Sequence, residues 1–116
     1  MEAFDLAQLL VEHKQASKLY LEFLRVPSLS VGLYRLAAGG VDPQQPHTED
    51  EVYYIVSGRG SIQVGEEHRA VETGSVVFVQ ANVEHRFHTI TEDLTILVFF
   101  APAEYTQASP KEKDVI

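Results

Sequence analysis

The spacing of hydrophobic residues changes after the first 18 positions and divides the chain into a helical and a β-rich part. Residues 4–16 repeat their apolar positions at the helical period, with Leu6, Leu9, Leu10 and His13 on one face. We therefore expect a short amphipathic helix packed against the outside of the following domain. A single histidine at the edge of an apolar face seldom marks a site, so His13 is expected to be structural.

The start of this helix carries a capping pattern. Asp5 is followed three residues later by Gln8, which is the spacing of a capping box. The helix is accordingly expected to begin close to Phe4.

Beyond the helix, apolar and polar residues alternate, which is the period of a strand. Turn-forming residues break this pattern into about eight short strands. The expected strands are 19–24, 29–36, 52–56, 61–64, 68–71, 75–79, 85–90 and 94–100. Residues 57–60 are expected to form a hairpin turn, and residues 91–93 a second turn. Short strands at regular spacing are typical of an all-β sandwich, jelly roll or closed barrel.

The length of 116 residues fits one domain. We expect the helix in residues 1–18, the barrel in residues 19–102 and a loose C-terminal tail in residues 103–116. Neither an internal repeat nor a linker suggests a further boundary.

Composition excludes several kinds of site and partner. The chain has no cysteine, so it has neither disulfides nor thiolate metal sites. A formal charge of −8 argues against nucleic acid as a partner, since phosphate binding needs a basic face. The acidic N-terminus does not resemble a signal peptide, and the apolar run 94–100 is far shorter than the roughly 20 residues that span a bilayer. We expect a soluble, cytoplasmic protein.

Candidate metal ligands lie in two segments that are far apart in the sequence. Gln45, His47 and Glu51 share one parity, and His85 begins a later strand. On a straight strand, His47 and Glu51 would be about 13 Å apart, which is too far for one ion. Both can bind the same ion only if residues 48–50 bend the chain.

The types of these residues favour a divalent cation. Two histidines and one carboxylate form the set of the facial triad, which leaves coordination positions open and suits non-haem iron. Gln45 is a weaker fourth candidate through its amide oxygen. Iron, manganese, nickel, cobalt and zinc all remain open.

The first of these segments resembles a known motif. The chain from Gly39 to Gly58 is similar to the first cupin motif, G-x5-H-x-H-x3,4-E-x6-G, with every interval kept. Gln45 stands at the first histidine of the motif, and His47 and Glu51 match its second histidine and its glutamate.

The second segment resembles the other cupin motif, G-x5-P-x-G-x2-H-x3-N. Gly74 and His85 match, whereas Gln80, Asn82 and Thr89 replace proline, glycine and asparagine. Asparagine tolerates the positive φ for which the motif uses glycine.

The resemblance implies a single cupin-type, jelly-roll-like β-barrel that often forms a homodimer. It also implies a divalent metal bound by Gln45, His47, Glu51 and His85. The first expectation is a metal-dependent enzyme acting on a small organic molecule, most simply an oxygenase and hence an oxidoreductase. A metal-dependent lyase or isomerase, and a non-catalytic cupin that binds or senses a small ligand, remain alternatives because the fold does not set the function.

Four further residues complete the expected site and its surroundings. Tyr53 and Phe87 share the parity of the metal ligands and are expected to fill the core or line a substrate pocket. Tyr53 is also the candidate for acid–base catalysis. His88 has the opposite parity and is expected to face away from the cavity. His68 lies in a turn among charged residues and is expected to be exposed to solvent.

The two acidic residues between His47 and Glu51 are not expected to bind the metal. Glu49 and Asp50 are expected to lie in a solvated turn.

Overall fold

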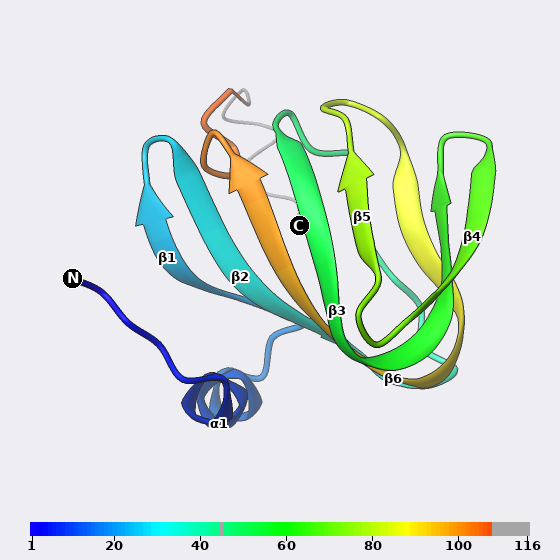
Figure 1. Cartoon of the computed structure of the whole chain (residues 1–116), viewed down its shortest axis with the longest axis horizontal. Coiled ribbons are helices and arrows are strands. Elements are labelled where there is room, and N and C mark those ends of the chain that lie inside the picture. Colours follow the sequence, from blue (N-terminus) through cyan, green and yellow to red (C-terminus); the bar gives the residue numbers. More distant parts are fainter. Residues whose placement is uncertain (45, 108–116) are drawn as a thin grey trace.

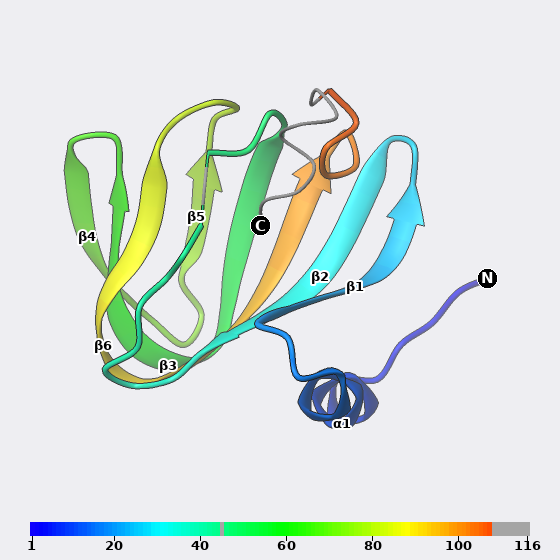
Figure 2. The same ribbon diagram turned by 180° about the vertical axis from the view of Figure 1, so that it is seen from behind.

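The computed structural model describes residues 1–44 and 46–107 and shows an all-β barrel with a short N-terminal helix (Figures 1 and 2). This architecture confirms the expected fold class. The elements of the described residues are α1 (Leu6–Ala16), β1 (Tyr20–Val26), β2 (Leu29–Leu36), β3 (Asp50–Val64), β4 (Glu67–Glu72), β5 (Val76–Val79) and β6 (His85–Ala101).

All strand pairs are antiparallel, and the strand order is β1-β2-β6-β3-β4, with β5 also beside β3. The two long strands β3 and β6 pair with each other along most of their length. β5 pairs with the first part of β3 (residues 51–54), and β4 with its last part (residues 59–64). The long pair therefore curves from one wall of the barrel to the other, as Figure 1 shows.

The two turns expected at residues 57–60 and 91–93 are wrong, because both segments lie inside long strands. The β3–β6 register shifts three times between Ile55 and Ser61, which marks β-bulges in place of turns. Gly58 has a φ of 105°, and a Cβ there would lie 2.2 Å from the Asp93 carbonyl oxygen. Glycine thus lets the two strands bend together without ending either of them.

Helix α1 lies outside the barrel at its β1–β2 end (Figure 2). It begins at Leu6, and Asp5 makes no side-chain capping hydrogen bond, so the expected capping box is wrong. Leu9 and His13 are its buried residues, and Nε2 of His13 lies 2.7 Å from the Leu19 carbonyl oxygen. His13 therefore ties the helix to the barrel. No helix among the described residues combines the length and apolar character needed to cross a membrane.

The barrel interior is filled by inward-facing residues of β2, β3, β4, β5 and β6. Tyr53 and Phe87 are both almost completely buried, and their rings meet edge to face with centroids 4.9 Å apart. Both residues therefore fill the core, which was one of the two roles expected for them; the other was to line a substrate pocket.

The described part of the expected tail, residues 103–107, forms a turn that packs against the barrel. The backbone N–H of Ala103 donates to the Pro27 carbonyl (3.3 Å), and that of Glu104 donates to the Ser30 hydroxyl (2.9 Å). This turn follows β6 directly and lies at the same end of the molecule as the start of β3 (Figure 1). Residues 108–116 lie outside the described residues.

Candidate metal centre

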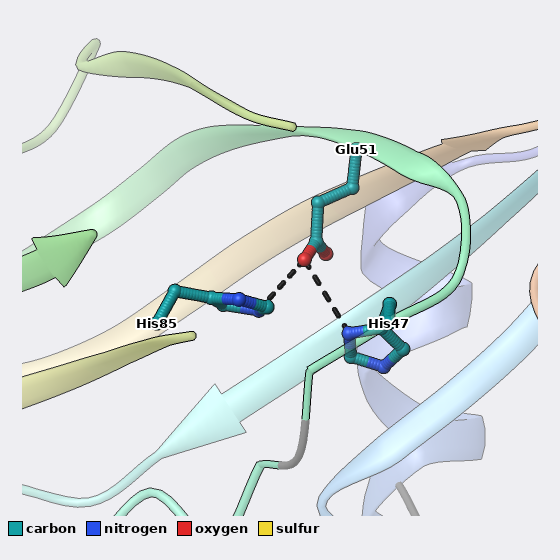
Figure 3. A group of neighbouring side chains, drawn as sticks. All are labelled: His47, Glu51 and His85. Carbon is teal, nitrogen blue, oxygen red and sulfur yellow. Dashed lines mark ion pairs between the residues drawn. The ribbon is translucent and has the colours of Figure 1, made fainter. Parts of the chain in front are cut away.

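Three predicted ligands meet inside the barrel, and Figure 3 shows their side chains converging. His47 precedes β3, Glu51 is the second residue of β3, and His85 begins β6. Oε1 of Glu51 lies 2.7 Å from Nε2 of His85 and 3.4 Å from Nδ1 of His47. The chain bends at residues 48–49 just before β3, which removes the 13 Å separation of a straight strand (about 3.3 Å per residue).

The three side chains are buried, yet several of their polar atoms lack partners. Both carboxylate oxygens of Glu51 and Nδ1 of His47 make no hydrogen bond among the described residues. An unpaired buried charge is costly, so such groups usually pair with one another or coordinate a metal.

The ring of His85 is oriented by a backbone carbonyl. Its Nδ1 lies 2.8 Å from the Val83 carbonyl oxygen, which can only accept a hydrogen bond, so Nδ1 carries the proton. Its Nε2 faces oxygen atoms alone, namely Oε1 of Glu51 and Oε1 of Gln44 at 3.3 Å. This nitrogen needs either a second proton or a cation between it and the oxygens.

His47 lies between two glutamates. Its Nε2 lies 2.9 Å from Oε2 of Glu104, which belongs to the turn after β6. Burial lowers the pKa of His47, but the nearby carboxylates of Glu104 and Glu51 outweigh this effect and raise the pKa to about 9. The pKa of Glu51 is lowered, because the effect of burial is outweighed by the two histidines.

A second polar network supports the site from the side of β2. Asp42 accepts hydrogen bonds from the hydroxyl of Tyr34, from Nε2 of Gln44 (2.6 Å) and from the backbone N–H of Phe87 (2.9 Å). The Tyr53 hydroxyl donates to Oε1 of Gln44 at 2.7 Å. Burial, followed by the charges of nearby acidic residues, raises the pKa of Tyr53 well above its usual value, so this hydroxyl stays protonated.

The remaining sequence expectations have mixed outcomes. Gln45 lies outside the described residues. His68 is exposed and His88 half-buried, and their rings contact each other, with Nδ1 of His68 3.1 Å from Nε2 of His88. Neither belongs to the metal group, as expected. Asp50 is exposed and accepts a hydrogen bond from the Ala81 N–H.

The expectation for Glu49 is wrong, because its side chain is buried rather than solvated. Its two carboxylate oxygens accept hydrogen bonds from the backbone N–H groups of Tyr105 (2.6 Å) and Gln107 (2.9 Å). Glu49 therefore fixes the turn that carries Glu104.

Sequence reasoning missed Glu104, Gln44 and Asp42. The irregular approach to β3 has no strand period, so parity could not place Asp42 and Gln44. Glu104 lies in a segment that reads as a polar tail. The only available signal was the number of acidic residues close to the two motifs.

A small cavity of about 10 Å³, room for about one water molecule, lies beside His47 and Glu104. Val98 and Phe100 contribute apolar walls. The hydroxyl of Tyr20, which also lines this cavity, is buried and makes no hydrogen bond among the described residues. The space beside His47 is thus small, with both polar and apolar walls.

The donor set fits a metal ion. Ligand atoms of His47, Glu51 and His85 all lie within 4.8 Å of one another. Two ligands at right angles on an ion with bonds of about 2.1 Å are separated by about 3.0 Å. The distances from Oε1 of Glu51 to the two histidine nitrogens, 2.7 and 3.4 Å, are close to this value. The three residues could hold a small divalent cation with only slight adjustment.

Comparison with known proteins identifies the family of this chain. Residues 32–100 match the cupin domain family. The chain belongs to the cupin family. The uncharacterized protein SCO3923 of Streptomyces coelicolor is 53% identical over 104 residues, covering 90% of this chain and 99% of the relative.

Solved structures share the cupin fold. TT1209 from Thermus thermophilus has a TM-score of 0.70 at 24% identity and covers 89% of this chain and 99% of its own. The DMSP lyase DddQ from Ruegeria pomeroyi has a TM-score of 0.61 at 25% identity, over 66% of this chain and 39% of its own.

Departures from the cupin motifs are accommodated locally. Asn82, in the place of a motif glycine, has a φ of 67°, which confirms that asparagine supplies the positive φ needed there. Thr89, in the place of the motif asparagine, also has a positive φ, at 49°.

Proposed function

We propose that this cupin binds one divalent metal ion per chain through His47, Glu51 and His85 and uses it to act on a small organic molecule. The observation that carries the proposal is the convergence of three buried ligand groups, in which both carboxylate oxygens of Glu51 and Nδ1 of His47 lack hydrogen-bond partners among the described residues. A site that only stabilised the fold would be expected to satisfy these atoms.

Iron is the first candidate metal, because two histidines and one carboxylate are the usual ligands of non-haem iron. Manganese, nickel, cobalt and zinc remain candidates. A metal bound in this way supplies open coordination positions for substrate and dioxygen, or polarises a substrate oxygen as a Lewis acid. Gln45, at the place of the motif's first histidine, stays a proposed fourth ligand.

The protein residues have separate roles in this proposal. Glu51 supplies negative charge that offsets the charge of the metal, and the Val83 carbonyl orients His85. Val98 and Phe100 give the space next to His47 apolar walls. Tyr53 holds Gln44 through its hydroxyl and, because its pKa is raised, acts as a hydrogen-bond donor rather than a base.

The reaction we propose first is oxygenation. The facial triad supports it, since this ligand set leaves adjacent positions for substrate and dioxygen. The small cavity beside His47 supports a small substrate.

A metal-dependent lyase or isomerase is the second candidate. It is supported by the similarity to the DMSP lyase DddQ and by Glu104, a carboxylate able to accept a proton beside the ligands. A non-catalytic ligand-binding cupin is the outcome if ligands bind without turnover.

Oxygen consumption separates these reactions. The protein is loaded anaerobically with Fe²⁺ and mixed with panels of small carboxylic acids, phenols, thiols and sulfonium compounds. We expect substrate-dependent oxygen uptake that is absent from the His85→Ala variant. Product formation without oxygen uptake would instead identify the lyase or isomerase.

The expected homodimer has a candidate surface on β5, where Val76 and Phe78 are 62% and 60% exposed. Burial of these side chains against a second copy would remove apolar area from water. Sedimentation velocity over a range of concentrations tests this prediction, and a monomer throughout would contradict it. The cytoplasmic location likewise stays a prediction.

A further inference from the structure

The turn after β6 brings a carboxylate to the far side of a proposed metal ligand. We propose that Glu104 is a positioning residue that holds His47 with Nδ1, rather than Nε2, directed at the metal. This inference rests on the proposed metal site and adds a residue that lies outside both cupin motifs.

The geometry of His47 supports this role. Oε2 of Glu104 lies 2.9 Å from Nε2, whereas the unpartnered Nδ1 lies 3.4 Å from Oε1 of Glu51. The two nitrogens of the ring therefore have different tasks. A carboxylate at Nε2 keeps the proton there and leaves the lone pair on Nδ1, which fixes both the tautomer and the ring orientation.

His85 shows the same arrangement with the nitrogens exchanged. Its Nδ1 donates to the Val83 carbonyl, and its Nε2 faces Glu51. Each histidine thus has one nitrogen held by an oxygen acceptor and the other directed at Glu51. Protein ligands of metals commonly have such outer partners, which orient the ring and raise its basicity.

The position of Glu104 is itself fixed by several contacts. Its N–H donates to the Ser30 hydroxyl, and its carbonyl accepts from Arg25 at 2.8 Å. On the other side of the turn, buried Glu49 accepts from the N–H groups of Tyr105 and Gln107. Both sides of the turn are therefore held in place, which fixes the Glu104 carboxylate beside His47.

Titration with Co²⁺ tests this role, because cobalt reports both affinity and ligand geometry through its visible absorption. The variants are Glu104→Ala, which removes the acceptor, and Glu104→Gln, which keeps an acceptor oxygen of nearly the same size. The control is Glu92→Gln, which removes an equal charge from a side chain that is 64% exposed and faces Arg59.

We expect Glu104→Ala to raise the Kd for Co²⁺ by about 10- to 100-fold and to change the visible spectrum of the bound ion. Glu104→Gln should raise the Kd by less than about 10-fold and shift the spectrum in the same direction. Glu92→Gln should match the wild type in both measurements.

Different results would overturn the role of Glu104 and the metal site itself. Wild-type Co²⁺ binding with an unchanged Kd and spectrum in both Glu104 variants would overturn the role of Glu104 and leave the metal site standing. If the wild type binds none of Co²⁺, Fe²⁺, Mn²⁺, Ni²⁺ and Zn²⁺, both proposals are overturned. If Glu104→Ala fails to fold, the spectrum of Glu104→Gln decides.

Discussion

Oε1 of Glu51 lies 2.7 Å from Nε2 of His85, inside the barrel and without a hydrogen bond of its own. Nδ1 of His85 already donates to the Val83 carbonyl, so Nε2 must either carry a second proton or share a cation with Oε1 of Glu51. A metal ion between the two atoms would meet this need.

The substitution Glu51→Gln therefore tests the site directly. The amide keeps the size of the side chain but loses the negative charge, and we expect the Kd for Co²⁺ to rise by at least about 100-fold, more than for an outer partner. Calorimetric titration measures it, with Glu92→Gln as the matched control. An unchanged Kd would show that the metal binds elsewhere.

The raised pKa of His47 predicts how the metal-free protein responds to pH. Its folded-state pKa of about 9 exceeds the ordinary histidine value of 6.5, so the folded state binds the proton more tightly. The resulting stabilisation, up to about 3 kcal/mol, is complete below about pH 6.5 and is lost as the pH rises through about 9.

Urea unfolding of the chelator-treated protein at about pH 6 and about pH 9.5 checks this dependence. We expect the wild type to lose more stability over this interval than His47→Gln, which lacks the titrating group. Equal losses in the two proteins would contradict the assignment to His47.

Gly58 is expected to be the most sensitive glycine of the long strands. Alanine at Gly58 requires an unfavourable positive φ and also places Cβ 2.2 Å from the Asp93 carbonyl oxygen. Gly74 is the matched control, since its φ is 92° but nothing lies within 4 Å of an added Cβ.

We expect Gly74→Ala to cost about 1–2 kcal/mol of unfolding free energy, and Gly58→Ala at least about 1 kcal/mol more, because the backbone of β6 must move. Chemical denaturation measures both. Equal costs would mean that the strands adjust freely at the bend.

The sequence predicted the fold and the convergence of His47, Glu51 and His85, because motif spacing specifies both. The sequence analysis divided β3 and β6 into shorter strands, which is wrong. A serine followed by a glycine, as at Ser57 and Gly58, is typical of a hairpin turn but also occurs in a β-bulge. The pairing of β3 with β6, which is distant in sequence, is what makes this segment a bulge rather than a turn.

The turn that carries Glu104 could not be predicted either, because it is held by contacts between residues that are distant in sequence. Glu49 reaches backbone groups more than 50 residues later, at Tyr105 and Gln107 (|i−j| of 56 and 58). Such contacts have no period and no local signature. An acidic residue that caps a distant turn looks the same in sequence as one that faces solvent.

Glu49 is predicted to hold the turn at residues 103–107 in place. In Glu49→Ala the N–H groups of Tyr105 and Gln107 lose their acceptors, which should cost about 1–3 kcal/mol and speed their amide hydrogen exchange. Exchange measured by NMR checks this, with amides of the β2–β6 pairing as the internal reference. Unchanged protection of Tyr105 would contradict the role of Glu49.

The most direct test of the central claim is the metal content of untagged protein purified without chelator, expressed as moles per chain. We predict close to one equivalent of a divalent transition metal in the wild type, and a large loss in both Glu51→Ala and His85→Ala. No metal in the wild type, even after anaerobic loading with each ion, or full occupancy in both variants, would contradict the account.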